Sequence, residues 1–239
     1  ITTIKFDDER ELQELAERIA RNVGRNINAE NPFVDARLPD GSRVHIIIPP
    51  LSRKGITITI RKHSSEPLKI EDLINKGTLS EEMAEFLRII TKAKLSFIVS
   101  GGTGSGKTTT LNVLSNFIPD EDRIITIEDS AELQLSHPHV VSLETKNKNS
   151  EGKGEVNIEQ LVKQTLRMYP TRIIIGETRD GTAYDLINSM STGHEGSAST
   201  IHANNPKNCV SRLTNLVLQK KMGLSPEDAR ILIGESVDL

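Results

Sequence analysis

The most restrictive feature of the sequence is the stretch SGGTGSGKTTT at residues 100–110, which directly follows the apolar run LSFIV. Gly101 to Thr108 match the pattern G-x-x-x-x-G-K-[ST], and apolar residues at helical spacing come after it. Glycines let successive backbone N–H groups turn inward toward an anion, where a Cβ would block the approach. A strand, this loop and a helix in that order predict a phosphate-binding loop in an α/β fold.

The alternative interpretation, a flexible Gly/Ser linker, does not explain why strand and helix signals flank the loop. We therefore predict a nucleotide site with ATP and Mg²⁺ as its ligands. Lys107 would reach the β- and γ-phosphates, and the Thr108 hydroxyl would coordinate Mg²⁺. The predicted binding residues are Gly102, Thr103, Gly104, Ser105, Gly106, Lys107, Thr108 and Thr109.

The rest of the C-terminal part alternates short apolar runs with helical patterns, which predicts a mainly parallel sheet covered by helices. One expected helix is capped by Asn157, and another begins at Ser225-Pro226. The expected strands are 95–100, 123–128, 139–144, 172–177 and 197–202.

The N-terminal part has a different pattern. Leu12, Leu15 and Ile19 predict one amphipathic helix, and alternating residues around Pro39-Asp40-Gly41 predict a hairpin, with a further strand at 55–62. We expect a partial α+β domain at 1–64, a linker at 65–78 and the nucleotide-binding domain at 79–239. Because the sequence begins without Met and stops inside an apolar pattern, we expect it to be part of a longer chain.

Composition narrows the possible functions. The net charge is -3, no Trp is present and aromatic residues make up 3%, so nucleic-acid binding by a basic surface or by stacking is not expected. Cys209 is the single cysteine, which excludes an internal disulfide and fits a reducing compartment. His137, His139 and His194 do not share metal-ligand spacing with it, so no structural zinc is expected. No apolar run is long enough to span a bilayer, so a membrane role would act through partners.

Polar residues follow several of the expected strands, where ligands bind in parallel sheets. Glu177 follows three isoleucines and could bind Mg²⁺ or polarise water, although a solvated strand-end Glu is the alternative. Glu128, Asp129 and Glu132 follow another strand, and one of them could be the general base; acids facing a helix dipole are the alternative. His202 ends a third strand, where it could contact the γ-phosphate or be a satisfied buried imidazole.

Taken together, the motifs SGGTGSGKTT, TIEDSAELQL, LRMYPTRIIIGETRD and STGHEGSASTIHANNP resemble the secretion-superfamily ATPases of type II and type IV secretion and type IV pilus systems. The resemblance covers essentially the whole chain and is nearest to the CpaF-like ATPases of tight-adherence (Flp) pili. It implies a RecA-like P-loop NTPase domain preceded by a small α+β domain. Thr171 and the residues TRD after Glu177 depart from the nearest branch, and we expect neither to touch the chemistry.

The resemblance also implies roles for the strand-end carboxylates. TIEDSAEL matches the family's Asp box, which implies Glu132 as the base for water, with Glu128 and Asp129 in support. IIIGE matches its atypical Walker B motif, which implies Glu177 near Mg²⁺. The metal ligands implied are thus Thr108, Glu177 and Glu128.

The remaining roles come from the resemblance as well. TGHEGSASTIHAN matches the His box, which implies His202 at the γ-phosphate and His194 as a second histidine. Arg43 and Arg61 match N-terminal arginines that complete a nucleotide site in this family, in some members across a subunit boundary; surface arginines are the alternative.

For the protein as a whole, the resemblance implies a cytoplasmic homo-hexameric ring at the inner face of the membrane. ATP hydrolysis would move an inner-membrane platform protein of a pilus or secretion system, with no direct nucleic-acid contact expected. Two alternatives remain open, a conjugative DNA translocase of related fold and an ATP-gated interaction module with little turnover.

Overall fold

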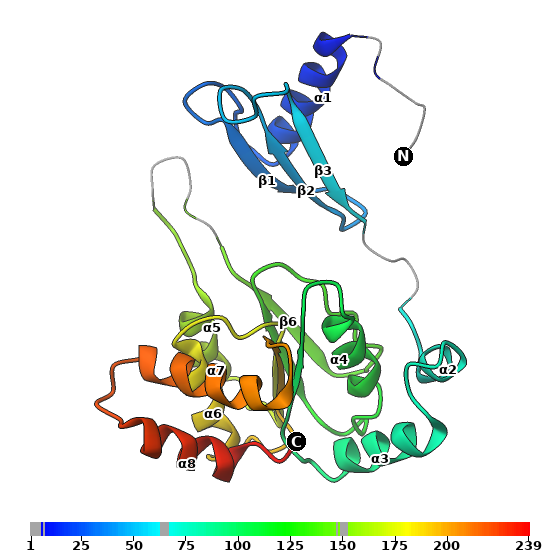
Figure 1. The fold of residues 1–239 in the computed structure, drawn as a ribbon, viewed down its shortest axis with the longest axis vertical. Helices are drawn as coiled ribbons and strands as arrows, with labels where there is room; N and C mark the ends of the chain where they lie inside the picture. The colour runs from blue at the N-terminus through cyan, green and yellow to red at the C-terminus, as the bar shows by residue number, and fades with distance from the viewer. Residues whose placement is uncertain (1–5, 7, 63–66, 147, 149–152) are drawn as a thin grey trace. The chain divides into compact units, whose positions relative to one another are not determined.

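The computed structural model describes residues 6, 8–62, 67–146, 148 and 153–239. The chain divides into two compact units, Ile1–Ser65 (unit 1) and Glu66–Leu239 (unit 2) (Figure 1). Unit 2 contains the glycine-rich loop and the strand-end residues that the sequence singles out, whereas unit 1 contains Arg43 and Arg61.

Unit 1 combines one helix with a three-stranded antiparallel sheet in the order β1-β2-β3. Asp8 caps the helix, since its Oδ1 accepts a hydrogen bond from the Glu11 N–H at 2.9 Å. Ala16 of the helix packs with Val44 and Ile46 of the central strand to form the core of the unit. The elements are α1 (Glu9–Asn22), β1 (Phe33–Arg37), β2 (Arg43–Ile47) and β3 (Thr57–Arg61).

The turn between β1 and β2 is the predicted hairpin. Gly41 has a φ of +85°, a left-handed conformation that favours glycine. Asp40 Oδ1 accepts a hydrogen bond from the Ser42 N–H at 2.9 Å, as aspartates in turns commonly do. The turn fixes the register of the two strands and therefore decides which side chains share a face of the sheet.

Unit 2 contains a five-stranded parallel sheet in the order β4-β8-β7-β5-β6. The prediction of a mainly parallel α/β sheet is therefore confirmed. The inner strands are almost completely buried, as expected for strands covered on both faces. The strands are β4 (Phe97–Gly101), β5 (Ile124–Glu128), β6 (Val140–Glu144), β7 (Arg172–Ile175) and β8 (Ala198–His202).

Two layers of helices cover this sheet (Figure 1). Leu111 and Leu114 of α4 pack with Ile174 on one face, and Ile173 and Ile175 belong to the larger core on the other face with α5, α6, α7 and α8. Alternate isoleucines of one strand thus serve two different cores. The helices are α2 (Ile70–Asn75), α3 (Glu81–Lys92), α4 (Lys107–Ser115), α5 (Ile158–Thr165), α6 (Thr182–Met190), α7 (Pro206–Gln219) and α8 (Pro226–Ser236).

Helix α2 lies inside the stretch that was expected to be a polar linker. Leu73 is buried and gives this short helix an anchor, and the Asp72 side chain accepts a hydrogen bond from the Lys69 N–H at 2.8 Å. Polar residues on both sides of this short helix obscured its pattern in the sequence. Helix α7 was not predicted either, although Asn205 as cap and Pro206 at its first position repeat the signal that identified α8.

Candidate nucleotide-binding site

The glycine-rich loop joins the end of β4 to the start of α4 and curves into a phosphate-sized cradle. Gly104 and Gly106 have φ angles of +70° and +90°. A Cβ added to Gly102, Gly104 or Gly106 would meet no heavy atom within 4 Å, so these glycines border open space rather than packed protein. A Cβ on Gly101, in contrast, would collide with the Ser105 side chain. The loop therefore fits a phosphate group held by backbone amides.

Lys107 opens α4 and reaches back over the loop. Its Nζ donates a hydrogen bond to the Gly102 carbonyl at 2.8 Å, and Ser105 Oγ donates to the same carbonyl at 2.9 Å. Thr108 and Thr109 follow in the first turn of α4. These two hydrogen bonds stabilise the curved conformation of the loop, and they keep the Lys107 ammonium group beside it.

His202 and Glu177 lie beside this loop. Thr103 Oγ1 is 3.2 Å from His202 Nε2, within hydrogen-bond distance, and His202 Nδ1 is 3.9 Å from Glu177 Oε1. The His202 side chain is 41% exposed, so the alternative of a satisfied buried imidazole does not fit. A continuous set of side chains therefore joins the loop, the end of β8 and the residues that follow β7.

Arg179 contacts Glu177 directly, which corrects the expectation that the residues TRD lie clear of the chemistry. The distance from its guanidinium to Glu177 Oε2 is 2.7 Å. Burial by itself would raise the pKa of Glu177, but the hydrogen bond and charge of Arg179, with the charges of Lys107 and His202, hold it below its usual value. Glu177 is therefore ionised at neutral pH and lies in a cationic environment. Thr171, the other departure, contacts the Arg123 backbone at the opposite end of β7.

Glu128 is buried and fixes the loop that follows β5. Its Oε1 accepts hydrogen bonds from the Glu132 N–H at 2.9 Å and from the Leu133 N–H at 3.0 Å. A Cβ on Gly176 would lie 2.9 Å from Glu128 Cγ, so the glycine before Glu177 makes room for this carboxylate. Glu128 thus positions the backbone of Glu132, and its assignment to Mg²⁺ stays a prediction.

Asp129 and Glu132 lie on this loop and share one cationic neighbour. Asp129 Oδ2 is 3.5 Å from the Arg179 guanidinium. The hydrogen bond with Glu177 is the main cause of the raised pKa of Arg179, and the charges of Asp129 and Glu132 add to it. The structure thus gathers the candidate base, the candidate metal ligand and the supporting carboxylate around Arg179, a residue to which the sequence motifs assign no role.

The two histidines of the His-box stretch lie at opposite edges of the sheet. His194 comes four residues before β8 begins, and His202 is its last residue, so the strand separates them by roughly 13 Å at about 3.3 Å per residue. Ser197 Oγ donates a hydrogen bond to the His194 carbonyl at 2.6 Å. The structure therefore places His194 away from the glycine-rich loop, and its role as the second histidine of the His box stays a prediction.

Arg43 and Arg61 belong to unit 1 and are cross-strand neighbours. Arg43 of β2 pairs in register with Arg37 of β1 on one side and with Arg61 of β3 on the other. Val44, the next residue, points into the core with α1, so the three arginines line the opposite face of the sheet. Sequence spacing alone could not show that Arg37 completes this row.

A parallel sheet, a phosphate cradle after β4, and an ionised carboxylate and a histidine at neighbouring strand ends define a P-loop NTPase domain. The family model described as "Type II/IV secretion system protein" matches residues 1–238, and the chain belongs to this family. Unit 2 thus has the secretion ATPase fold, as predicted. The placement nearest to the tight-adherence branch stays a prediction.

Individual relatives agree with this assignment. A putative conjugal transfer protein of Mycobacterium tuberculosis (strain CDC 1551 / Oshkosh) is 38% identical over 219 residues, covering 89% of this chain and 62% of the relative. The type IV secretion system protein VirB11 of Bartonella henselae is 34% identical over 265 residues, covering 96% and 74%. The crystal structure of the VirB11 ATPase of Brucella suis superposes with a TM-score of 0.59 at 34% identity, covering 97% and 76%. The chain thus spans less than two thirds of the length of some of its relatives.

Proposed function

We propose that this chain is part of a motor ATPase that hydrolyses Mg-ATP to power type IV secretion or pilus assembly. The observation that carries this proposal is the set of contacts from Thr103 through His202 to Glu177, which connects the phosphate cradle to an ionised carboxylate. The Brucella suis VirB11 structure was determined in complex with sulphate, an anion that resembles phosphate.

Each residue has one proposed role in hydrolysis. Lys107 reaches the β- and γ-phosphates, Thr108 and Glu177 hold Mg²⁺, His202 contacts the γ-phosphate, and Glu132 activates the attacking water. Bound Mg²⁺ would neutralise charge that develops on the phosphates. Glu128 keeps the backbone of Glu132 in place through its two accepted hydrogen bonds.

We further propose that Arg43 and Arg61 complete a nucleotide site in a homo-hexameric ring. The cross-strand register places Arg37, Arg43 and Arg61 in one row on the same face of the sheet, where several guanidinium groups can contact one anion. Arginine suits this role because its planar guanidinium binds phosphate oxygens in pairs.

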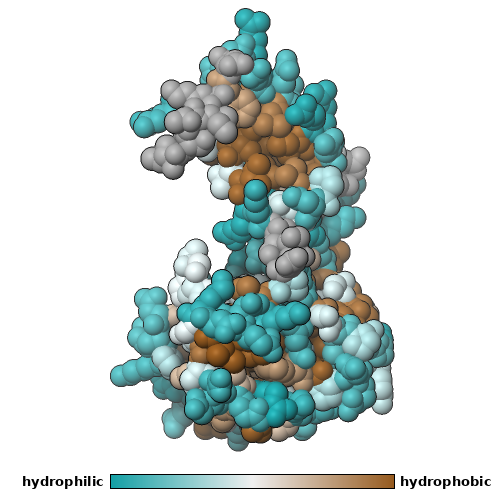
Figure 2. Space-filling view, turned by 90° about the vertical axis from the view of Figure 1, so that its right-hand side faces the viewer, coloured by the Kyte–Doolittle hydropathy of each residue, from teal (hydrophilic) through white to brown (hydrophobic). Residues whose placement is uncertain are grey.

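Exposed apolar surface supports assembly into a ring. Met83, Phe86 and Ile89 of α3 lie at helical spacing and are 57%, 53% and 54% exposed. Figure 2 shows apolar side chains gathered over the sheet of unit 1 on the β3 side, where Ile60 is 48% exposed. Surfaces of this kind are commonly covered by partner subunits.

The proposed partners are further copies of the chain and an inner-membrane platform protein, with the ring at the cytoplasmic face. Among the residues that the structure describes, no helix is long and apolar enough to cross a membrane. The names of several relatives refer to conjugal transfer, so a DNA translocase is the second candidate. An ATP-gated interaction module with little turnover is the third.

The test measures ATP turnover per subunit of the full-length protein with Mg²⁺ over a wide range of protein concentration. Specific activity is expected to rise with concentration if neighbouring subunits complete each site. An Arg43→Gln/Arg61→Gln double variant and a Lys107→Ala variant should each be inactive when assayed alone. A mixture of the two should recover part of the activity, because the intact P-loop of the double variant can then lie next to the intact arginines of a Lys107→Ala subunit. A flat concentration curve with no recovery would overturn the shared site, and negligible turnover at every concentration would favour the interaction module.

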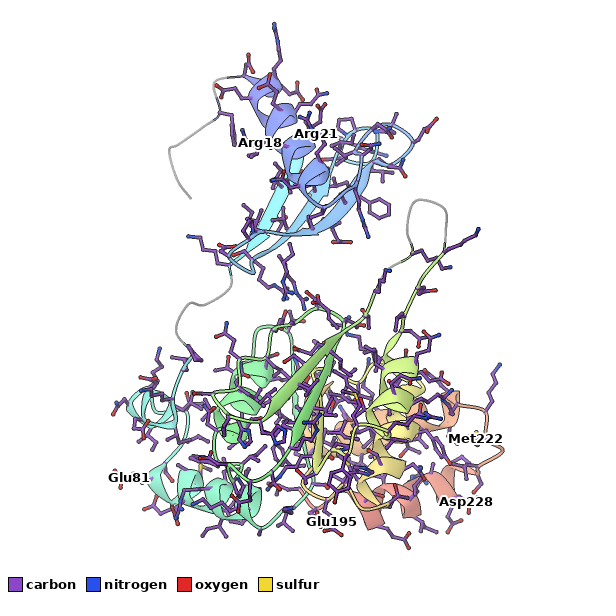
Figure 3. The ribbon with its side chains drawn as sticks, turned by 180° about the vertical axis from the view of Figure 1, so that it is seen from behind. Arg18, Arg21, Glu81, Glu195, Met222 and Asp228 are labelled. Atoms are coloured by element: carbon purple, nitrogen blue, oxygen red, sulfur yellow. The ribbon has the colours of Figure 1, made fainter. Side chains whose placement is uncertain are left out.

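Two controls complete the experiment. An Arg18→Gln/Arg21→Gln double variant removes the same charge from the exposed side of α1 in the same unit and should keep full activity (Figure 3). DNA is added in parallel, both single- and double-stranded. Strong stimulation by DNA would favour the translocase over the protein-secretion motor.

A further inference from the structure

Arg179 lies between two carboxylates that come from different strand ends. It follows β7 by four residues, and its guanidinium is 2.7 Å from Glu177 Oε2 and 3.5 Å from Asp129 Oδ2. Its side chain is 58% exposed, so packing does not hold it there. Charge attraction to the two acids, with Glu132 close enough to contribute, accounts for its position.

Arg179 contacts the Glu177 carboxylate, the same group that the proposed function assigns to Mg²⁺. Glu177 Oε2 accepts the hydrogen bond from Arg179, and Oε1 faces His202 Nδ1 at 3.9 Å. Both oxygens of Glu177 therefore already have a nitrogen neighbour. A divalent cation bound at Oε2 would repel the guanidinium and compete with it for the same lone pairs.

The structure contains space into which the arginine can move. A hollow of about 610 Å³ is bordered by Asp129, Arg179 and Asp180 and by the starts of α5 and α6. Arg179 can enter this hollow while it keeps its attraction to Asp129, because both residues line it.

We propose that Arg179 is a positioning residue that neutralises Glu177 when the metal is absent and gives way when the metal binds. Arg179 therefore competes with the metal for Glu177, and replacing Arg179 by an uncharged residue tightens metal binding. On release from Glu177 it shifts toward Asp129, so metal binding at the end of β7 is transmitted to the loop after β5 that carries Glu132. This inference rests on the proposed role of Glu177 as a metal-side carboxylate.

The test titrates Mn²⁺, which stands in for Mg²⁺, into the full-length protein with bound ADP and follows free Mn²⁺ by electron paramagnetic resonance. Protein is kept in excess of ADP so that the nucleotide stays bound. Arg179→Gln is expected to tighten Mn²⁺ binding about two- to fivefold, the size of effect that one exposed ion pair supports. Arg179→Lys should fall between, because it keeps the charge but loses the planar fork. Arg230→Gln on the exposed face of α8 is the matched control and should leave Mn²⁺ affinity unchanged.

The outcomes separate this inference from the proposed function. Glu177→Gln should weaken Mn²⁺ binding; if it does not, the metal assignment is wrong and this inference falls with it. If Glu177→Gln weakens Mn²⁺ binding while Arg179→Gln leaves it unchanged or weaker, only the role of Arg179 is overturned. Affinities for ATP and ADP without metal give a second readout. Loss of ATP binding alone in Arg179→Gln would make Arg179 a γ-phosphate ligand and would also overturn the inference.

Discussion

The two edges of the five-stranded sheet treat charged groups in opposite ways. At the carboxyl edge, the Glu177 and His202 side chains are 27% and 41% exposed, and Arg179 is held only by ion pairs that a ligand can replace. At the amino edge, the Arg172 and Asp122 side chains are 0% and 4% exposed and lie 2.8 Å apart. One edge keeps its charges available to a ligand, and the other uses them to hold the fold together.

The amino edge shows how a buried charge is made tolerable. Arg172 Nε donates to Asp122, its Nη1 donates to the Thr91 carbonyl at 2.7 Å, and Lys94 Nζ lies 2.9 Å from the second Asp122 oxygen. Burial alone would raise the pKa of Asp122, but hydrogen bonds from Lys94 and Arg172 hold it below its usual value. Gly196, with a φ of +74°, covers the guanidinium, since a Cβ there would come within 2.6 Å of it.

The largest expected effect on stability comes from breaking this pair. Asp122→Asn keeps the shape but leaves Arg172 buried without a counter-charge in contact, so the free energy of unfolding of unit 2 should fall by about 3–5 kcal/mol. Both tyrosines, Tyr169 and Tyr184, lie in unit 2, so tyrosine fluorescence during urea unfolding reports on this unit alone. ATP turnover per folded molecule should not change.

Two further measurements test whether the burial of the Asp122–Arg172 pair causes the loss of stability expected for Asp122→Asn. Glu85→Gln removes the exposed pair with Arg88 on α3 and should cause no measurable loss of stability. The pKa of Asp122 is lowered in the folded state, so its contribution is present above the unfolded pKa of about 3.9 and is lost as the pH falls through the folded value. The difference between wild type and Asp122→Asn should therefore shrink in acid; a constant difference would contradict the ion-pair explanation.

At the carboxyl edge, a substitution should lower ATP turnover strongly and the free energy of unfolding only slightly. Lys107→Ala removes the ammonium at the mouth of the cradle, and ATP turnover should fall about a hundred- to a thousandfold, as for other single electrostatic contacts to a reacting group. Its hydrogen bond to the Gly102 carbonyl is partly exposed, so unfolding in urea should change little. Lys92→Ala at the exposed end of α3 is the control. A large loss of stability in Lys107→Ala would mean that the lysine mainly holds the loop together.

The sequence predicted the carboxyl edge well because its signals are local. Runs such as Ile173–Ile175 predict buried parallel strands, and parallel strands bring the residues that follow them to one edge. The order of motifs along the chain is therefore sufficient to group Glu177, His202 and the glycine-rich loop at one site.

The amino edge and the finer contacts of the site could not be predicted in this way. Asp122 and Arg172 are 50 residues apart, and an arginine that opens a strand usually remains solvated. Glu128 can be buried because Gly176 has no side chain. The two residues lie at the ends of neighbouring strands, and their contact cannot be read from the sequence. Arg179 lies only two residues after Glu177 in a segment without regular structure, where residue spacing does not determine which side chains meet.

The smallest expected effect comes from Glu159 at the start of α5, in the same hollow that Arg179 lines. Hydrogen bonds from Lys163 and Lys220 lower the pKa of Glu159 to about 2, yet its side chain is 36% exposed, so water screens the pair. Glu159→Gln should lower the free energy of unfolding by less than about 1 kcal/mol at pH 7. The loss should shrink in 0.5 M NaCl and as the pH falls from about 4.5 toward 2, because a lowered carboxyl pKa stabilises the fold only above that range. Salt should leave the Asp122→Asn effect almost unchanged, because that pair is buried. If both variants respond equally to salt, burial does not distinguish the two edges of the sheet, and the contrast between them concerns only which groups a ligand can reach.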